Sequence, residues 1–135
     1  MSLDVIPQSH RPLLSDEVRA FAFLATTMED GSPQVTPVWF NTDGEHILIN
    51  SKQGRVKDEN IRQRPNVALA IQDPDDPYRY LQIRGRVVEI TTEGAREHID
   101  HLAYKYTGDE QYKGFHPGDV RVTYVIESES VSVMG

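Results

Sequence analysis

The sequence contains no cysteine. Disulfide bonds, thiolate nucleophiles and cysteine-ligated zinc or iron–sulfur sites are therefore excluded. Long apolar runs are also missing, since none approaches the roughly 20 residues that span a bilayer. The first twelve residues lack the basic segment and apolar run that a signal peptide needs. We therefore expect a cytoplasmic protein that does not associate with membranes.

Basic residues are fewer than acidic ones, with 14 Lys and Arg against 21 Asp and Glu, for a net charge of −7. A chain this acidic is a poor general binder of nucleic acid, whose phosphates require a basic surface. Residues 52–64 nevertheless hold five basic and two acidic side chains, a local charge of +3 that leaves −10 for the rest. This basic segment is either a site for a small anion or a solvated helix face, and charge alone leaves both interpretations open.

Sequence motifs for side-chain catalysis are absent as well. No serine stands in a G-x-S-x-G elbow, and neither common glycine-rich phosphate loop occurs. His98 and His101 have the spacing of a metal-ligating pair, but no third histidine lies at a motif distance. A partly exposed helix face is the better interpretation of the pair. We expect no metal site, and the sequence assigns no catalytic side chain.

What the sequence does contain is a series of short β-strands. Its 135 residues suit one domain, 1–135, and its four Phe, six Tyr and one Trp are enough to anchor one core. Asp-Gly turns separate the first apolar runs, which predicts a meander. Gly85 predicts a β-bulge or a close backbone approach. The strands are expected at residues 22–28, 34–41, 45–50, 66–72, 80–90, 121–127 and 131–134.

Two or three short helices are expected besides these strands. Ser15 is a suitable cap for a helix through about residue 24. A second helix is expected over residues 54–64, where Pro65 ends it. The third, over residues 92–106, has apolar residues at helical spacing. Short strands with a few short helices favour a small antiparallel barrel.

The basic segment combines several groups that bind anions. A strand ends in Asn50 and Ser51, a glycine turn follows, and Arg55 and Lys57 open the next helix. A helix start offers free N–H groups and a positive dipole end. Arginine forks onto phosphate oxygens and lysine adds a point charge. Asn60 is expected to hold the turn instead of touching a ligand. The alternative is an ordinary capped helix with solvated basic residues.

Several stretches of the chain together resemble a known family. They include Thr-Pro-Val-Trp-Phe at 36–40, Gly-Arg-Val-Lys-Asp-Glu-Asn at 54–60 and Pro-Asn-Val-Ala-Leu at 65–69. Matching residues also occur at 26–35, 50–51, 78–80, 84–87 and 101–108. The sequence resembles the flavin-binding split-barrel superfamily related to pyridoxamine 5′-phosphate oxidase. Within it, the chain is most similar to the deazaflavin (coenzyme F-420)-dependent members.

The resemblance implies a mainly β fold with short helices, a six-stranded antiparallel split β-barrel of the FMN-binding type. It also implies a homodimer with two equivalent cofactor sites at the subunit interface. The phosphate and ribityl end of the cofactor would be held by the segment of Asn50, Ser51, Arg55 and Lys57. The flavin ring would lie along Thr36, Pro37 and Val38. The partner subunit would line the site with Tyr78, Arg79 and Tyr80.

The function implied is that of an oxidoreductase, in which reduced coenzyme F-420 delivers hydride to a small, electron-poor organic substrate. The alternatives are an FMN-binding reductase or oxidase on the same barrel, and a non-enzymatic carrier of a flavin-type cofactor. The cofactor carries the chemistry in each enzyme, so no side-chain nucleophile is required. The resemblance does not extend to the arginine-containing tail of pyridoxamine phosphate oxidases, because residues 127–135 lack arginine. Oxidation of pyridoxamine phosphate is therefore not expected.

Overall fold

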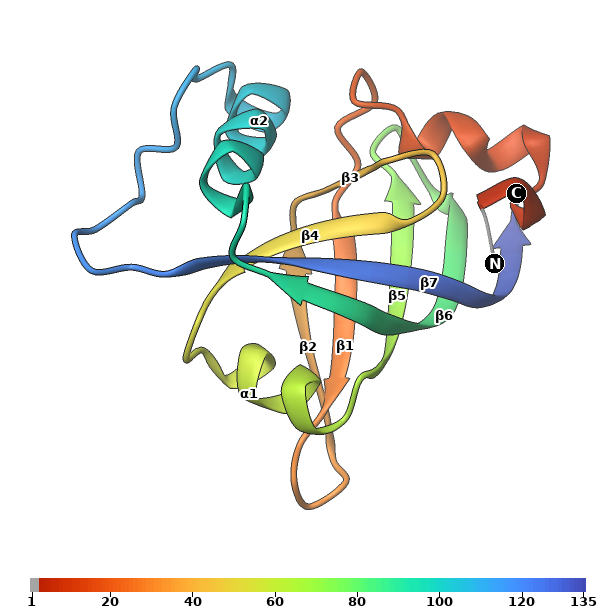
Figure 1. The fold of residues 1–135 in the computed structure, drawn as a ribbon. Coiled ribbons are helices and arrows are strands. Elements are labelled where there is room, and N and C mark those ends of the chain that lie inside the picture. The colour runs from red at the N-terminus through yellow and green to blue at the C-terminus, as the bar shows by residue number, and fades with distance from the viewer. Residues whose placement is uncertain (1–2) are drawn as a thin grey trace.

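Seven strands form one antiparallel sheet in the computed structural model, which describes residues 3–135 (Figure 1). Their order across the sheet is β2-β1-β5-β6-β7-β4-β3. The strands are β1 (Ala22–Thr27), β2 (Pro33–Val38), β3 (Phe40–Thr42), β4 (Ile47–Lys52), β5 (Asn66–Asp73), β6 (Asp76–Thr91) and β7 (Arg121–Met134). The helices are α1 (Val56–Gln63), α2 (Ala95–Thr107) and the 3-10 helices η1 (Leu3–Val5) and η2 (Gln8–Leu14).

The two edge strands of the sheet, β2 and β3, follow each other in the chain with only Trp39 between them. Strands at opposite edges can be one residue apart only if the sheet curls until those edges approach. The result is an incomplete barrel of the split type. Its seven strands correct the expected six. One predicted strand, 34–41, is broken at Trp39 to give β2 and β3, whereas 121–127 and 131–134 are joined in the continuous β7.

The prediction of a close backbone approach at Gly85 is confirmed. The register of β6 against β7 shifts between Arg84 and Gly85 and again between Val87 and Glu89. A Cβ atom at Gly85 would overlap the backbone carbonyl of Glu127. Bulges increase the bend and twist of a strand, so these irregularities let the two longest strands wrap around the core.

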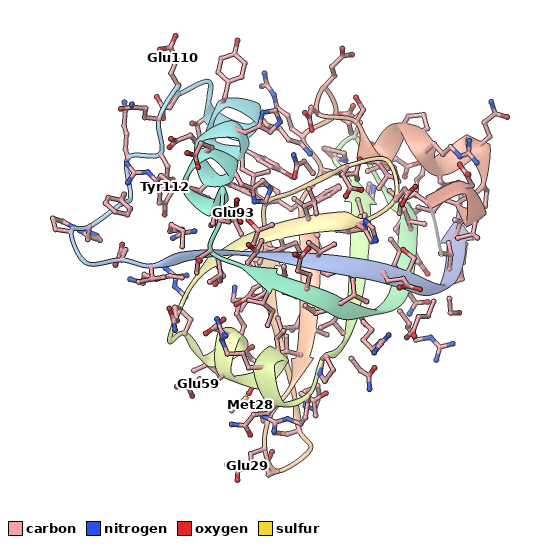
Figure 2. The ribbon with its side chains drawn as sticks, in the orientation of Figure 1. Met28, Glu29, Glu59, Glu93, Glu110 and Tyr112 are labelled. Atoms are coloured by element: carbon pink, nitrogen blue, oxygen red, sulfur yellow. The ribbon has the colours of Figure 1, made fainter. Side chains whose placement is uncertain are left out.

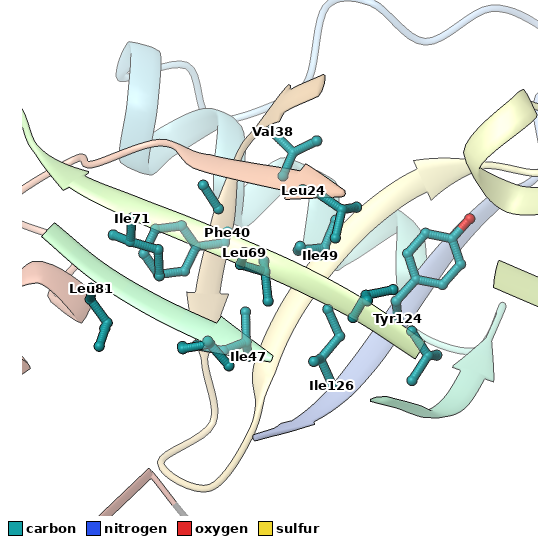
Figure 3. Packing of buried hydrophobic residues seen from close by; sticks show 14 of the residues in the cluster. Leu24, Val38, Phe40, Ile47, Ile49, Leu69, Ile71, Leu81, Tyr124 and Ile126 are labelled. Carbon is teal, nitrogen blue, oxygen red and sulfur yellow. The ribbon is translucent and has the colours of Figure 1, made fainter. Parts of the chain in front are cut away.

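The core fills the inside of the curled sheet. Burial alternates along β4, because Ile47 and Ile49 are fully buried while Leu48 is only half-buried. Figure 3 shows that these side chains meet residues from strands far apart in sequence, including Phe40 and Tyr124. The largest fully buried side chains are Tyr124, Phe40, Ile6, Leu13, Leu24, Ile47, Ile49, Ile61, Leu69, Ile71, Leu81 and Ile83.

The helix predicted over residues 15–24 is wrong. The helical turn lies earlier, in η2, and Ser15 follows its C-terminal end. Arg19 has a φ of 59°, and Ala22 already begins β1. Because β1 forms ladders with both β2 and β5, sheet pairing outweighs the local preference for helix at this position.

The other two helices are confirmed with slightly shorter bounds. The expected apolar side of α2 is buried through Ala95, Ile99, Leu102 and Ala103. Gly108, with a φ of 80°, ends that helix in the left-handed conformation that glycine adopts at little cost. Among residues 3–135, no helix has the length and apolar character needed to cross a membrane.

The buried carboxylate of Asp58 fastens the start of α1 to the barrel. It accepts hydrogen bonds from Tyr124 Oη at 2.7 Å, Arg62 Nε at 2.9 Å and the Gly54 N–H at 3.1 Å. Burial raises the pKa of Asp58, but these hydrogen bonds outweigh burial and leave that pKa below its ordinary value. Burial and the same contact raise the pKa of the Tyr124 phenol. In Figure 3 the Tyr124 hydroxyl is directed out of the apolar cluster.

Asn60 provides a second attachment for α1. Its amide nitrogen donates to Thr26 Oγ1 at 3.0 Å and to Met28 Sδ at 3.3 Å. From the end of the helix, Arg64 Nε donates to the Thr27 carbonyl at 2.8 Å. The prediction that Asn60 holds the glycine turn is wrong, because its amide nitrogen donates to Thr26 and Met28, whereas the Gly54 N–H is bound by Asp58. Through these contacts α1 is attached to both β1 and β7.

A substitution at Gly85 tests the close approach between β6 and β7. Gly85→Ala should lower the free energy of unfolding by about 1–3 kcal/mol, since the added methyl group overlaps the Glu127 carbonyl. Denaturant unfolding measures this change. Val88→Ala, on the exposed side of the same strand, should change it by less than about 0.5 kcal/mol. Equal effects of the two substitutions would contradict the close approach.

The Asp58 anchor predicts a pH-dependent stability difference. Because the folded pKa of Asp58 is lowered, its contribution is full above the unfolded pKa of about 3.9 and is lost as pH falls through the folded value. Asp58→Asn should therefore lower the free energy of unfolding by about 1.5–3 kcal/mol at pH 7. The difference from wild type should shrink as unfolding is measured at pH values from 7 down to 3. A difference independent of pH would show that the charge of Asp58 does not stabilise the fold.

Candidate functional site

A cavity of about 290 Å³ opens where the two sheet edges approach each other. It lies between the β2–β3 junction, the end of β4, the start of α1, and α2 with the loop that follows it. Its volume is at the lower end of the range for small-molecule sites. The residues lining it are Phe21, Pro37, Val38, Trp39, Asn50, Ser51, Arg55, Lys57, Ile99, Tyr112 and Arg121.

Three cations line this cavity, and none of its lining residues is acidic. Burial, together with the charge of Arg55, lowers the pKa of Lys57. Burial lowers the pKa of Arg121, and the charge of Arg55 lowers it further. Within residues 3–135, no ion pair is formed by the side chain of Arg55 or Lys57. This concentration of positive charge in a chain of net charge −7 favours an anionic ligand.

The backbone at the start of α1 adds to this positive potential. Gly54 turns the chain into the helix with a φ of 95°, which is strained for other residues. Arg55 occupies the N-cap position, and its side chain does not cap the helix. The first N–H groups of a helix have no partner within it, so this end carries partial positive charge toward anions.

Asn50 and Ser51 also line the cavity, but their polar groups are directed into the protein. Asn50 Nδ2 donates to the Ala95 carbonyl at 2.8 Å, and Asn50 Oδ1 accepts from Arg121 Nε at 2.9 Å. The buried Ser51 hydroxyl lies beside the Tyr124 phenol. A direct bond from either residue to a cofactor stays a prediction.

Aromatic side chains form one wall of the cavity. The rings of Trp39 and Tyr106 are stacked with centroids 5.3 Å apart and 7° between their planes. Phe21 also stacks on Tyr106, with ring centroids 5.2 Å apart, and Tyr112 meets Trp39 edge-on at 6.1 Å. Tyr112 is labelled in Figure 2, on the loop beside α2. Planar ligand rings stack favourably on such a wall.

Tyr106 is fixed in this stack by the backbone. Its hydroxyl donates to the Ala20 carbonyl at 2.6 Å and accepts from the Phe40 N–H at 3.2 Å. Burial raises the pKa of Tyr106 to about 12. The phenol is therefore protonated at neutral pH and acts as a structural support of the wall.

The structure places six of the ten residues expected at the site around this cavity. They are Pro37, Val38, Asn50, Ser51, Arg55 and Lys57. Thr36 precedes them on β2 and is half-buried, but it does not line the cavity. Sequence reasoning missed Phe21, Trp39, Ile99, Tyr112 and Arg121. Trp39, the one tryptophan, lies within a matched motif and could have been included, whereas Tyr112 and Arg121 have no local signal.

Residues 78–80 belong to β6 and lie beside the C-terminal end of β7, whereas the cavity adjoins the N-terminal end of β7. Tyr80 pairs with Met134 at the end of that strand, whereas Arg121 begins it. Arg79 donates from Nη2 to the Ser9 carbonyl at 2.5 Å, and Tyr78 is 82% exposed. Within one chain these three residues do not reach the cavity, so their expected role depends on a second copy and stays a prediction.

The two histidines of α2 face different partners. His98 Nε2 lies 2.8 Å from Asn41 Oδ1, and His101 Nε2 lies 3.1 Å from Asp16 Oδ2. Burial, with smaller effects of His101 and Arg121, lowers the pKa of His98 to about 4. The described residues contain no group of three or more histidine, aspartate or glutamate side chains suited to a metal ion.

Solved structures with this architecture include one named as an F420 reductase. It is 34% identical in sequence, with a TM-score of 0.81, and the similarity covers 94% of this chain and 98% of that one. A conserved hypothetical protein from Mycobacterium tuberculosis is 21% identical, with a TM-score of 0.70 and coverage of 96% and 85%. HupZ from Group A Streptococcus is 21% identical, with a TM-score of 0.65 and coverage of 96% and 94%. The last two show the shared fold.

No curated protein matches the chain. The family model described as pyridoxamine 5′-phosphate oxidase matches residues 8–132, which include every strand except the last residues of β7. The curled antiparallel sheet, the cavity at its seam and this match agree: the chain belongs to the pyridoxamine 5′-phosphate oxidase family.

Proposed function

We propose that the protein is an oxidoreductase that binds a flavin-type cofactor in the seam cavity. The first choice of cofactor is coenzyme F-420, with hydride transfer to a small, electron-poor organic substrate. The observation that carries the proposal is the cavity itself, where three cations and a helix start adjoin an aromatic wall without any acidic residue. The similarity to an F420 reductase over nearly the whole chain supports the choice of coenzyme F-420.

The lining residues fit a ligand with a planar ring and an anionic tail. Arg55, Lys57 and the first N–H groups of α1 suit phosphate oxygens. Pro37 and Trp39 offer apolar surface for the ring. The cavity of one chain is small for a whole flavin-type cofactor, which supports a site completed by a second copy.

In this mechanism the cofactor, when bound, supplies the hydride. The chain's own residues bind and orient the cofactor and exclude water from it. The cations fix the anionic tail, and the aromatic wall restricts the tilt of the ring, so that binding energy is used for orientation. No side chain is required as nucleophile, consistent with a phenol at Tyr106 that is protonated at neutral pH.

An FMN-binding reductase or oxidase is the second candidate, and the family match supports it. The two cofactors differ in absorption maximum. The absorption spectrum of a coloured preparation, or a titration with each cofactor, therefore identifies the one that binds. A non-enzymatic carrier would bind the cofactor but would not consume its reduced form with any electron acceptor.

We further propose a homodimer formed through the outer surface of β2, β1 and β5. On the outer side of these strands, six apolar side chains neighbour one another in the strand register: Phe23, Ala25, Val35, Pro37, Ala68 and Ala70. Phe23 is 39% exposed and Val35 is 63% exposed. This much exposure is unusual for a cluster of neighbouring apolar side chains. This outer apolar face reaches the cavity through Pro37, so a copy packed there would adjoin the ligand.

Removal of the cavity cations should weaken cofactor binding. Arg55→Ala and Lys57→Ala should each raise the Kd for coenzyme F-420 about 10- to 150-fold, the value of one charge-assisted contact. Fluorescence titration measures this, with FMN as a parallel ligand. The Tm of the protein without cofactor should hardly change, because burial and Arg55 already disfavour the charge on Lys57. Lys113→Ala, outside the cavity, is the matched control. Unchanged affinity in both cavity variants would identify the basic segment as a solvated helix face.

The dimer proposal is tested by sedimentation. The wild-type protein should have twice the 15.3 kDa chain mass at micromolar concentration. Val35→Lys, which places a charge within the outer apolar face, should give the monomer and weaken cofactor binding as well. Val88→Lys, on an exposed position of β6, should leave the dimer intact. A wild-type monomer that binds cofactor fully would contradict an interfacial site.

A further inference from the structure

Arg121 is the cavity cation that no sequence pattern marks, and it is also the one held most firmly. Its Nε donates to Asn50 Oδ1 at 2.9 Å. Its guanidinium lies over the ring of Tyr112, 5.2 Å from the centroid. A long side chain fixed on two sides loses little further freedom when a ligand binds, which favours affinity.

The orientation of the Asn50 amide follows from its contacts with α2. Its Nδ2 donates to the Ala95 carbonyl at 2.8 Å and lies 3.2 Å from His98 Nδ1. Because the amide nitrogen is directed to α2, the amide oxygen faces Arg121. A flipped amide would lose the bond to Ala95 and would place N–H groups against the guanidinium.

The tautomer of His98 supports this orientation. Its Nε2 lies 2.8 Å from Asn41 Oδ1, an acceptor, so Nε2 carries the proton. Nδ1 is then an acceptor, 3.2 Å from Asn50 Nδ2 and 3.0 Å from Thr123 Oγ1. Burial lowers the pKa of His98 to about 4, so this neutral form is maintained at neutral pH. A chain of directed hydrogen bonds thus runs from β3 through α2 to the cavity.

We propose that Arg121 binds the anionic group of the ligand directly, and that Asn50 and His98 are positioning residues that orient Arg121 for this contact. The inference rests on the proposed function in taking that anionic group to be the tail of a flavin-type cofactor. It assigns Asn50 a part in binding that is exerted through Arg121.

A double-mutant cycle tests the relation between Asn50 and Arg121. Arg121→Gln should raise the Kd for coenzyme F-420 or FMN about 10- to 150-fold, and Asn50→Leu about 2- to 10-fold. The double variant should bind no more weakly than Arg121→Gln alone, because Asn50 acts through Arg121. Effects that multiply would overturn the positioning role. Wild-type affinity in Arg121→Gln would overturn the direct contact.

Two further variants separate binding from folding. Arg96 resembles Arg121 in lying over an aromatic ring, Phe115, at 3.7 Å, but it does not line the cavity. Arg96→Gln should therefore leave the Kd unchanged. If Asn50→Leu does not fold, His98→Gln replaces it in the cycle. The double variant His98→Gln with Arg121→Gln should then bind no more weakly than Arg121→Gln alone.

Inorganic pyrophosphate distinguishes this inference from the proposed function. In NMR spectra the Arg121 Nε–H resonance should be protected from exchange in the wild type and should shift when pyrophosphate is added. Protection should be lost in Asn50→Leu. A pyrophosphate shift without binding of either cofactor would overturn the proposed function and keep the anion site. Cofactor binding that needs Arg55 but not Arg121, with no pyrophosphate shift, would overturn the inference alone. Absence of all binding would overturn both.

Discussion

The position of Trp39 between two edge strands is the constraint on which the rest of the structure depends. β2 and β3 lie at opposite edges of a seven-stranded sheet and yet are one residue apart in the chain. The sheet must therefore curl, and its inner face becomes the core shown in Figure 3. The same junction places the Trp39 ring at the seam, where it stacks on Tyr106. Curl, core and cavity wall thus have one geometric origin.

Charge is arranged around this seam with a clear division of roles. Asp58, the acidic residue nearest the start of α1, is buried and hydrogen-bonded to Tyr124 and Arg62. Its charge is used to attach the helix and is kept out of the cavity lining. The positive groups of the seam are left to face the cavity, which concentrates positive charge there on an acidic protein. Attachment of the helix and the positive charge of the cavity thus depend on different residues of the same short segment.

Much of the fold can be predicted from local sequence signals. Alternation identifies β4, glycine and proline mark the ends of the helices, and Gly85 marks a close approach. Residues 15–24 are not predicted correctly, because the pairing of β1 on both sides is a long-range effect. The division of residues 34–41 into β2 and β3 is not predicted for the same reason, since the break at Trp39 follows from sheet curl. The candidate site shows the same limit. Asn50, Arg55 and Lys57 are close in sequence and can be grouped by their spacing alone. Tyr112 reaches the cavity from the irregular loop after α2, and Arg121 reaches it from the start of β7.

The prolines of β2 have a consequence for solubility. In an antiparallel pair, alternate residues direct their N–H groups to opposite sides, and proline has none to donate. The backbone N–H groups of Gln34, Thr36 and Val38 are directed to β1. The corresponding backbone positions of Pro33, Val35 and Pro37 are therefore directed to the free edge of the sheet. Val35 is then the one residue of β2 that offers an N–H along this edge. The seam cannot close by continuous hydrogen bonding, and a strand from another molecule finds little to pair with. The opening that leaves room for a ligand is thereby protected from edge-to-edge aggregation.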